Sequence, residues 1–311
     1  MDSSSHSAHL CFFLLSALLF PSSLAARMLQ VELEKEPLTI TYHKGALLYG
    51  PISVNLIWYG NFNASQRSIV SDFVASLSSG DPLNNKPSMS SWWAMAEKYC
   101  VQSKKALPRL TLGDQIIDEN YSLGKSLKNL DIVALATKGR HQHAINVVLT
   151  SDDVTIEGFC MSRCATHRSS PLSKAGLFAY IWVSNSMLQC PGQCSRPFHQ
   201  PDYGPQAPPF VAPNGVVGVD SIVMNLASTI FRALTFPFDG GGFFIGPKTA
   251  LLEAATACTA IYGKRAYAGY AGELLVDSVT GASYNASGAN GRKSLLPAIF
   301  DPSTASCSSL L

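Results

Sequence analysis

The chain has 311 residues, of which 47% are hydrophobic and 14% are charged. A chain of this length and composition can bury a large core in one domain without a structural metal or a partner subunit. The formal net charge is only +2. Because this value is close to neutral, it excludes nucleic-acid binding as an expectation.

Residues 1–26 are predicted to be a signal peptide. Leu10 to Phe20 form an apolar stretch of 11 residues, and the small side chains of Ser23 and Ala25 suit a cleavage site. A helix that spans a bilayer needs ~20 apolar residues, so this stretch is too short to be a membrane span. The sequence therefore predicts a secreted protein with one mature domain over residues 27–311 and no membrane span.

The first half of the mature chain alternates between strand and helix patterns. Strands rich in β-branched and aromatic residues are expected at Ile52–Tyr59, Leu110–Ile117 and Ile145–Leu149. Helices are expected from Ser65, a candidate N-cap, to a stop at Gly80-Asp81-Pro82, from Pro87 to Tyr99, and from Gly124 to Ala136. This alternation predicts an α/β fold with a mixed, largely parallel sheet and helices on both of its faces.

The second half is organised around a segment rich in proline. An apolar strand is expected at Leu177–Val183, and residues 195–213, which we call the proline-rich crossing, contain six prolines that exclude helix and central strand. Its aromatic and His side chains favour an ordered loop over a disordered one. Helices are then expected at Val219–Leu234, which has the clearest apolar face, and at Leu251–Tyr262, before a tail of turns and short strands from Gly269.

Cysteines and sequons agree with an extracellular protein. Seven cysteines remain once Cys11 leaves with the signal peptide, so three disulfides would leave one thiol free. We expect two bonds among Cys160, Cys164, Cys190 and Cys194, in any of three pairings, and a bond from Cys258 to Cys307 that holds the tail. The Asn-X-Ser sequons at Asn63, Asn120 and Asn285 are candidate glycosylation sites.

No motif in the sequence indicates catalysis. Gly241–Thr249 is similar to a phosphate-binding loop, but Pro247 removes a backbone N–H that such a loop needs. The sequence contains neither the G-x-S-x-G elbow of hydrolases nor the HExxH pair of zinc peptidases. We therefore expect a protein that is not an enzyme and that needs no cofactor.

Aromatic side chains in segments rich in Pro and Gly offer a platform on which a polysaccharide could stack. They are Phe198, Tyr203, Phe210, Tyr262, Tyr267 and Tyr270. Many aromatic side chains of this kind only pack against their own loop, but loops are also where binding sites lie. A glycan-binding module is therefore an alternative function.

Four stretches carry a resemblance to a known family. They are YHKGALLYGPISVNLIWYGNF, FCMSRCATH, YIWVSNSMLQCPGQCSRPFHQPDYGPQAPPFVAPNG and LLVDSVTGASYNASGANGRKSLLPAIFDPSTASCSSL. The chain resembles the EXORDIUM-like family of plants, also called phosphate-induced proteins, over nearly all of its mature length. The resemblance implies a secreted protein of the apoplast or cell wall that takes part in growth and cell expansion, responds to brassinosteroid hormones and nutrients, and has no established enzymatic activity. A cell-wall polysaccharide and an extracellular receptor are the partners it suggests. The family more often has an aromatic residue at the position of Cys100, so the resemblance implies that Cys100 is the odd cysteine, with a free and buried thiol.

Some distant relatives of that family resemble zinc peptidases in one helix, where they carry a His-Glu pair. Ser228 and Thr229 occupy these positions here, with Arg232 one turn later. Hydroxyl groups cannot replace an imidazole ligand and a general-base carboxylate, so we hypothesise a degenerate zincin-like domain without a metal. The corresponding cleft would bind a ligand through Phe198, His199, Tyr203, Phe210, Ser228, Thr229 and Arg232, with Gly240–Gly242 as its wall. A metallopeptidase-like hydrolase is the second alternative, and its zinc ligands would be sought at His167, His199 and Glu253.

Overall fold

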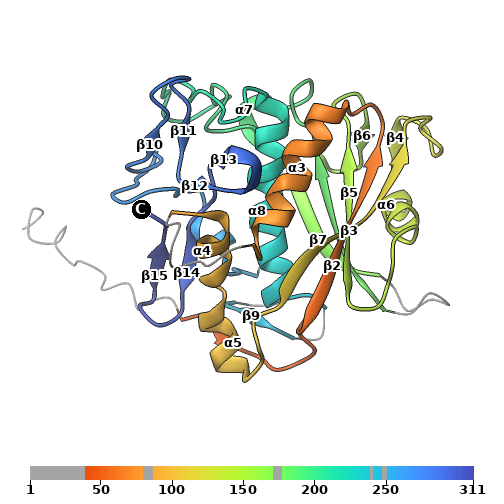
Figure 1. Ribbon diagram of the computed structural model, residues 1–311, viewed down its shortest axis with the longest axis horizontal. Helices are drawn as coiled ribbons and strands as arrows, with labels where there is room; N and C mark the ends of the chain where they lie inside the picture. Colours follow the sequence, from red (N-terminus) through yellow and green to blue (C-terminus); the bar gives the residue numbers. More distant parts are fainter. Residues whose placement is uncertain (1–38, 80–86, 171–176, 239–240, 247–250) are drawn as a thin grey trace, which may run out of the picture. The chain divides into compact units, whose positions relative to one another are not determined.

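A five-stranded mixed sheet lies at the centre of residues 39–311, in the strand order β3-β2-β5-β8-β7 (Figure 1). The computed structural model describes residues 39–79, 87–170, 177–238, 241–246 and 251–311. The sheet strands are β2 (Pro51–Tyr59), β3 (Arg109–Asp118), β5 (Ala144–Thr150), β7 (Ala165–Ser169) and β8 (Ala179–Ser184). The pairs β2/β3, β2/β5 and β5/β8 are parallel, whereas β7 is antiparallel to β8. The expected α/β fold with a mixed sheet is confirmed.

Several predictions fall outside the described residues. They are the signal peptide (residues 1–26), the helix stop at Gly80-Asp81-Pro82, Gly240 of the glycine-rich wall, and Pro247 to Thr249 of the loop similar to a phosphate-binding loop.

Both faces of the sheet are covered because its side chains alternate between them. In β2, Val54, Leu56 and Trp58 join one core cluster, and Ile57 and Tyr59 join another. Helices α3 (Ala64–Ser76) and α8 (Val217–Thr235) pack on the first face, and α6 (Asn129–Ala136) packs on the second (Figure 1). Every residue of β5 and β8 is buried as a result.

Helix α8 is the main helix of the core. Of the described residues, only this stretch is long and apolar enough to cross a membrane, and 78% of its most apolar window is buried inside the protein. Its burial against β7, β8 and α3 is that of a core helix. The sequence predicted it as Val219–Leu234, within two residues of its observed ends.

Three other predicted helices differ from the structure. Helix α3 is capped by Asn63 and not by Ser65, because the Asn63 side chain accepts a hydrogen bond from the backbone N–H of Gln66 at 2.9 Å. The stretch from Pro87 to Tyr99 divides into α4 (Met89–Ala94) and α5 (Glu97–Ser103). The stretch from Gly124 to Ala136 begins with strand β4 (Ser126–Leu127), which pairs with β6 (Thr155–Ile156), so that α6 starts only at Asn129.

The prediction of a helix at Leu251–Tyr262 is wrong. Only a three-residue 3₁₀ helix, η1 (Thr256–Cys258), forms there. Leu252 exchanges two backbone hydrogen bonds with Ile245, and the backbone N–H of Tyr262 donates to Ala271. These long-range bonds use backbone groups that a continuous helix would need.

The remaining elements are short, as expected for the tail. They are α7 (Pro191–Cys194), the pair β1 (Thr41–Tyr42) and β9 (Phe243–Phe244), the pair β10 (Leu275–Val276) and β11 (Ser283–Tyr284), the pair β12 (Ala286–Ser287) and β13 (Lys293–Ser294), the pair β14 (Ile299–Asp301) and β15 (Ser306–Ser308), and the 3₁₀ helix η2 (Ala289–Gly291). The tail is tied to the core by an ion pair between Arg292 and Asp72 of α3 and by the Trp92 indole, which donates to the Pro297 carbonyl at 2.8 Å.

Three disulfides form, as the sequence predicted. Cys160 bonds to Cys190, and Cys164 bonds to Cys194, which settles the pairing that the sequence left open. The bond from Cys258 to Cys307 holds the tail, and Cys100 is free and buried.

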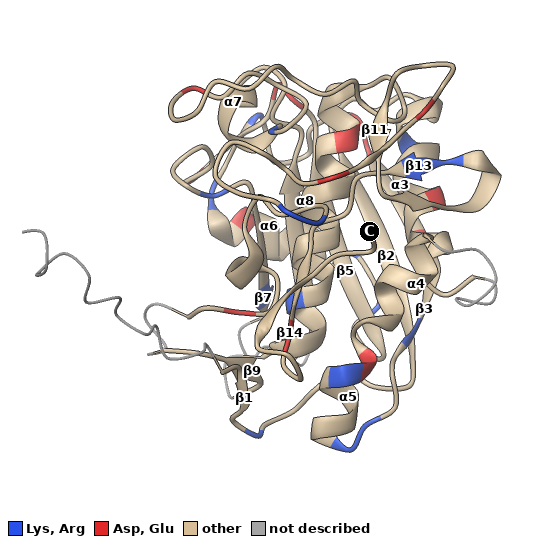
Figure 2. Ribbon diagram, turned by 90° about the vertical axis from the view of Figure 1, so that its left-hand side faces the viewer, with Lys and Arg blue, Asp and Glu red and all other residues tan. Residues whose placement is uncertain are grey.

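Basic and acidic residues are interspersed over the fold in the view of Figure 2.

Candidate functional site

The proline-rich crossing is fixed at both of its ends. At its start, two disulfides hold α7, and the side-chain amide of Asn225 on α8 donates to the Cys194 carbonyl at 3.0 Å. At its end, the buried carboxylate of Asp220 accepts hydrogen bonds from the backbone and the side chain of Asn214. The crossing is therefore an ordered segment, as its aromatic content predicted.

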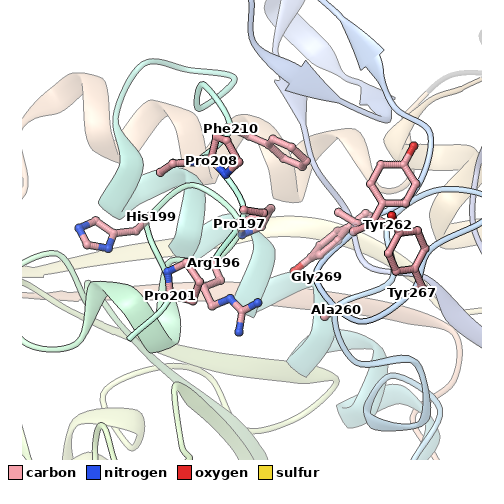
Figure 3. A pocket seen from close by; sticks show the side chains of 14 residues that line it. Arg196, Pro197, His199, Pro201, Pro208, Phe210, Ala260, Tyr262, Tyr267 and Gly269 are labelled. Carbon is pink, nitrogen blue, oxygen red and sulfur yellow. The ribbon is translucent and has the colours of Figure 1, made fainter. Parts of the chain in front are cut away.

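A pocket of about 350 Å³ opens between the crossing and residues 260–271 (Figure 3). We call it the aromatic pocket, because Phe210, Tyr262, Tyr267 and Tyr270 line it together with several prolines. Phe210 extends from the crossing toward Tyr262, and His199 lies on the side opposite Tyr262 and Tyr267 (Figure 3). Among the described residues that line it, Arg196 is the one with a permanently charged side chain. The pocket thus combines ring faces with a few polar groups, as small-molecule sites do.

A tight turn presents two of the tyrosines. The backbones of Tyr267 and Tyr270 exchange hydrogen bonds of 3.0 and 2.8 Å, and their ring centroids are 5.1 Å apart. Gly269 in this turn has φ +88°, and an added Cβ would lie 2.6 Å from the Pro205 Cβ. Only glycine therefore lets this turn approach the crossing so closely.

Tyr262 forms the floor of the aromatic pocket and joins it to the core. Its hydroxyl donates to the sulfur of Met224 on α8 at 2.8 Å, and burial raises the pKa of Tyr262 well above its ordinary value. Phe198, Ala212, Ala271 and Leu295 pack around these two residues. The floor of the aromatic pocket is therefore part of a buried apolar cluster.

A second pocket, of about 310 Å³, lies beside the C-terminal end of α8. We call it the charged pocket; its lining consists of His167, Arg168, Arg232, Phe236, Pro237, Leu251 and Glu253. His167 Nε2 lies 3.1 Å from Glu253 Oε1, and Arg232 Nε donates to Glu253 Oε2. Burial raises the pKa of Glu253, but the contacts with His167 and Arg232 outweigh burial and hold it below its ordinary value.

The seven residues of the predicted cleft do not come together. Only His199 and Phe210 line the aromatic pocket, and only Arg232 lines the charged pocket. Phe198 is buried beneath the aromatic pocket, and Tyr203 is exposed outside it. Ser228 and Thr229 line neither pocket, and the Thr229 hydroxyl donates to the Asn225 carbonyl of its own helix.

The prediction that Gly240–Gly242 form a wall of the cleft is wrong for Gly241 and Gly242. An added Cβ on Gly241 would lie 2.0 Å from the Lys44 carbonyl oxygen, and one on Gly242 would lie 2.4 Å from the Thr235 carbonyl oxygen. These glycines permit close approach between backbone segments. Neither lines the aromatic or the charged pocket.

The three candidate zinc ligands lie in two different pockets. His167 and Glu253 are in contact, but His199 belongs to the aromatic pocket. Within the described ranges, the structure contains no group of three or more His, Cys, Asp or Glu side chains that could hold a metal ion.

The three sequons lie in different environments. Asn63 and Asn120 are exposed. Asn285 is only 1% exposed, and its side-chain nitrogen donates to the carbonyls of Tyr262 and Leu296 at 2.8 and 2.7 Å. A glycan on that nitrogen would displace both bonds, so the folded chain does not accommodate Asn285 as a glycosylation site.

Comparisons with known proteins agree with the resemblance seen in the sequence. A family described as "Phosphate-induced protein 1 conserved region" matches residues 40–310. The chain is 58% identical to Protein PHOSPHATE-INDUCED 1 of Nicotiana tabacum over 284 residues, which cover 89% of this chain and 90% of that protein. It is 56% identical to Protein EXORDIUM of Arabidopsis thaliana over 298 residues, which cover 93% and 95%, and 58% identical to Protein EXORDIUM-like 1 of the same plant over 276 residues, which cover 86% and 89%. No solved structure shows significant similarity to it.

Proposed function

The chain belongs to the phosphate-induced protein family, which includes EXORDIUM, and on this premise we propose that it is a secreted, growth-related plant protein that acts by binding. Its place of action in this proposal is the apoplast or cell wall. Its ligand is a cell-wall glycan, and the aromatic pocket is the site that holds it.

The aromatic pocket is the observation that carries this proposal. Tyr267 is 71% exposed, and its ring leans toward that of Tyr270 at the mouth of a preformed hollow of about 350 Å³. The C–H face of a pyranose ring is apolar and packs well on an aromatic face. Arg196 and His199 offer polar groups to the sugar hydroxyls.

Secretion is supported by chemistry outside the pocket. Three disulfides persist only in an oxidising compartment. Asn63 and Asn120 are exposed acceptors for glycans in that compartment. Mass spectrometry of secreted protein is expected to find glycan at Asn63 or Asn120 and none at Asn285.

The proposal includes the absence of catalysis and a distant relation to zincins. The long helix α8 packs across the sheet directly after β8 and the crossing, but it has Ser228, Thr229 and Arg232 where a zinc peptidase would need ligands and a general base. The purified protein is expected to contain no stoichiometric zinc and to cleave no general peptidase substrate. One zinc per chain, with activity that a chelator abolishes, would contradict this part of the proposal.

A glycan array followed by a matched pair of variants tests the glycan proposal. Tyr267 and Tyr203 are both tyrosines of the same region, 71% and 70% exposed, but only Tyr267 lines the aromatic pocket. Tyr267→Ala is expected to weaken binding of the best glycan roughly tenfold, because it removes one stacking face. Tyr203→Ala is expected to leave the affinity unchanged.

Two results would contradict the proposal. One is a wild-type protein that retains no glycan from wall polysaccharide. The other is an equal loss of affinity in both variants, which would show that exposed tyrosines contribute without regard to the pocket.

A further inference from the structure

The aromatic pocket has a positive charge without a negative one to balance it. Among its described lining residues none is acidic, and Arg196 supplies the positive charge. The proline-rich crossing has one acidic residue, Asp202, but its carboxylate lies against α7, where an added Cβ on Gly192 would be 2.0 Å from Asp202 Oδ1. Residues 260–271, on the other side of the pocket, include no Asp or Glu. The pocket therefore offers a cation that has no counter-ion of its own.

The Arg196 side chain is half-buried and unpaired. Among the described residues it has no hydrogen bond, ion pair or cation–π contact. In the view of Figure 3 its guanidinium group lies between Pro201 and Ala260, two apolar residues of the lining. Removing a charged group from water is costly unless the group is paired. An unpaired guanidinium group in an apolar hollow therefore indicates an anionic ligand.

The positive charge of Arg196 reaches the floor of the pocket. Burial raises the pKa of Tyr262, and the Arg196 guanidinium acts in the opposite direction. The charge of Arg196 therefore favours a negative oxygen at the floor. Its attraction for an anion is stronger there than in open water, because apolar side chains replace part of the solvent.

The rest of the lining suits a sugar ring better than an inorganic anion. The rings of Phe210, Tyr267 and Tyr270 line a hollow of about 350 Å³. An inorganic anion has no apolar face to offer these rings, whereas the C–H face of a pyranose packs on them. His199 donates through Nδ1 to the Gln200 carbonyl at 2.9 Å, so Nε2 of the neutral ring can accept a hydrogen bond from a sugar hydroxyl group. The pocket thus matches a ligand with a ring, hydroxyl groups and a carboxylate.

We propose that the aromatic pocket selects an acidic glycan made of uronic-acid units, and that Arg196 determines this choice. The guanidinium group binds the carboxylate of one uronic-acid ring through two parallel hydrogen bonds, while the tyrosine faces hold the ring. The inference rests on the glycan function proposed above and names the class of glycan. Arg196 adds affinity for a charged sugar and none for the same sugar without its charge.

Ligand-observed NMR titration of the full secreted protein with the disaccharide digalacturonate and with its dimethyl ester tests this inference. The two probes have the same rings and hydroxyl groups, and the ester lacks only the negative charges. The wild type is expected to bind digalacturonate at least tenfold more tightly than the ester, because only the acid pairs with the guanidinium group. This comparison needs no variant.

Arg196→Gln isolates the contribution of the cation. It is expected to weaken binding of digalacturonate roughly tenfold and to leave the affinity for the ester unchanged. Its thermal unfolding is expected to match the wild type, because the Arg196 side chain pairs with no described residue. Arg196→Lys keeps the charge but loses the planar fork, so its affinity for digalacturonate is expected to lie between those of Arg196→Gln and the wild type.

Arg265→Gln is the matched control. Arg265 belongs to the same loop as Tyr267, but its side chain is 82% exposed, pairs with Glu273 and does not line the aromatic pocket. Its loss changes the net charge by the same amount as Arg196→Gln. At physiological ionic strength a charge this exposed is screened, so the variant is expected to bind digalacturonate like the wild type.

Three results would overturn the inference. They are binding of the ester as tight as that of digalacturonate, equal losses in Arg196→Gln and Arg265→Gln, and binding of inorganic phosphate as tight as that of digalacturonate. If the wild type bound both sugars equally and Tyr267→Ala weakened both, the glycan function would stand and only the choice of an acidic glycan would fall. If the wild type bound neither these sugars nor wall polysaccharide, both would fall.

Discussion

The two ends of helix α8 each meet a buried carboxylate, but the two carboxylates have different partners. At the N-terminal end, Asp220 accepts hydrogen bonds mainly from Asn214. At the C-terminal end, Glu253 contacts His167 and Arg232. Burial raises the pKa of Asp220 to about 6 against the opposing effect of its hydrogen bonds and of Arg292, whereas the pKa of Glu253 ends below its ordinary value.

Burial acts in the same direction on both groups, so the difference comes from their partners. Hydrogen-bond donors and Arg292 offset only part of the desolvation of Asp220, while His167 and Arg232 together offset more than all of it for Glu253. We therefore expect Asp220, at the N-terminal end of α8, to make the stability of the fold depend on pH near neutrality. At the C-terminal end, we expect stability to depend on the charge of Arg232. Three predictions test this contrast.

The largest effect is expected when Glu253 loses its arginine. Arg232→Met leaves a buried carboxylate without its cation and is expected to lower the free energy of unfolding by about 3 kcal/mol. Urea unfolding at pH 6 measures it. In Arg232→Met/Glu253→Gln the charge to be paired is gone, so at least half of the loss should return; a double variant no more stable than the single one would contradict the argument.

The second prediction concerns the pH dependence of stability. The folded pKa of Asp220 is about 6 and lies above its ordinary value of 3.8. The folded state therefore binds more protons than the unfolded state between these two pKa values. The contribution of Asp220 to the free energy of unfolding is full below pH ~4 and is lost as the pH rises through ~6. Up to about 3 kcal/mol is expected to be lost between pH 4 and pH 7.

Asp220→Asn is expected to remove this loss, as measured by urea unfolding across that pH range. Glu253→Gln is the control, because a carboxylate with a lowered pKa contributes above the unfolded pKa and loses its effect only as the pH falls through the folded value. If Asp220→Asn kept the wild-type slope near neutrality, another group would be responsible.

The smallest effect is expected at Asn214. Its side-chain amide donates to Asp220 Oδ1 at 2.6 Å and favours the ionised form. Asn214→Ala is expected to shift the midpoint of the pH-dependent loss upward and to lower stability by roughly 1 kcal/mol. Unfolding curves at closely spaced pH values locate the midpoint, and a midpoint that does not move would show that the backbone donors alone set it.

The parts of the fold that the sequence predicted best are those with strong periodicity. Strands β2 and β5 and helix α8 are buried segments, and their apolar residues mark them clearly. Strand β7 was missed, because Ala165–Ser169 is a half-buried edge strand with polar side chains. The helix expected at Leu251–Tyr262 failed because a disulfide and distant backbone partners determine that segment.

The two pockets differed in how far the sequence could predict them. The aromatic pocket left a local signal, because Phe210, Tyr262, Tyr267 and Tyr270 all stand among prolines and glycines in the sequence. The charged pocket joins His167, Arg232 and Glu253 from three separate elements. Local spacing in the sequence carries no signal for such a contact. Arg232 was among the predicted cleft residues, and His167 and Glu253 were named only as zinc ligands of the metallopeptidase alternative.

The free cysteine has a consequence for how the chain reaches its final disulfides. Burial raises the pKa of Cys100 to about 11, so at neutral pH only about one thiol in ten thousand is the nucleophilic thiolate. Once Tyr99 and its neighbours have packed, Cys100 cannot attack the three completed bonds at a useful rate. Competition between Cys100 and the six paired cysteines is therefore confined to the time before the core closes, and the three disulfides of the folded protein are protected from exchange with Cys100.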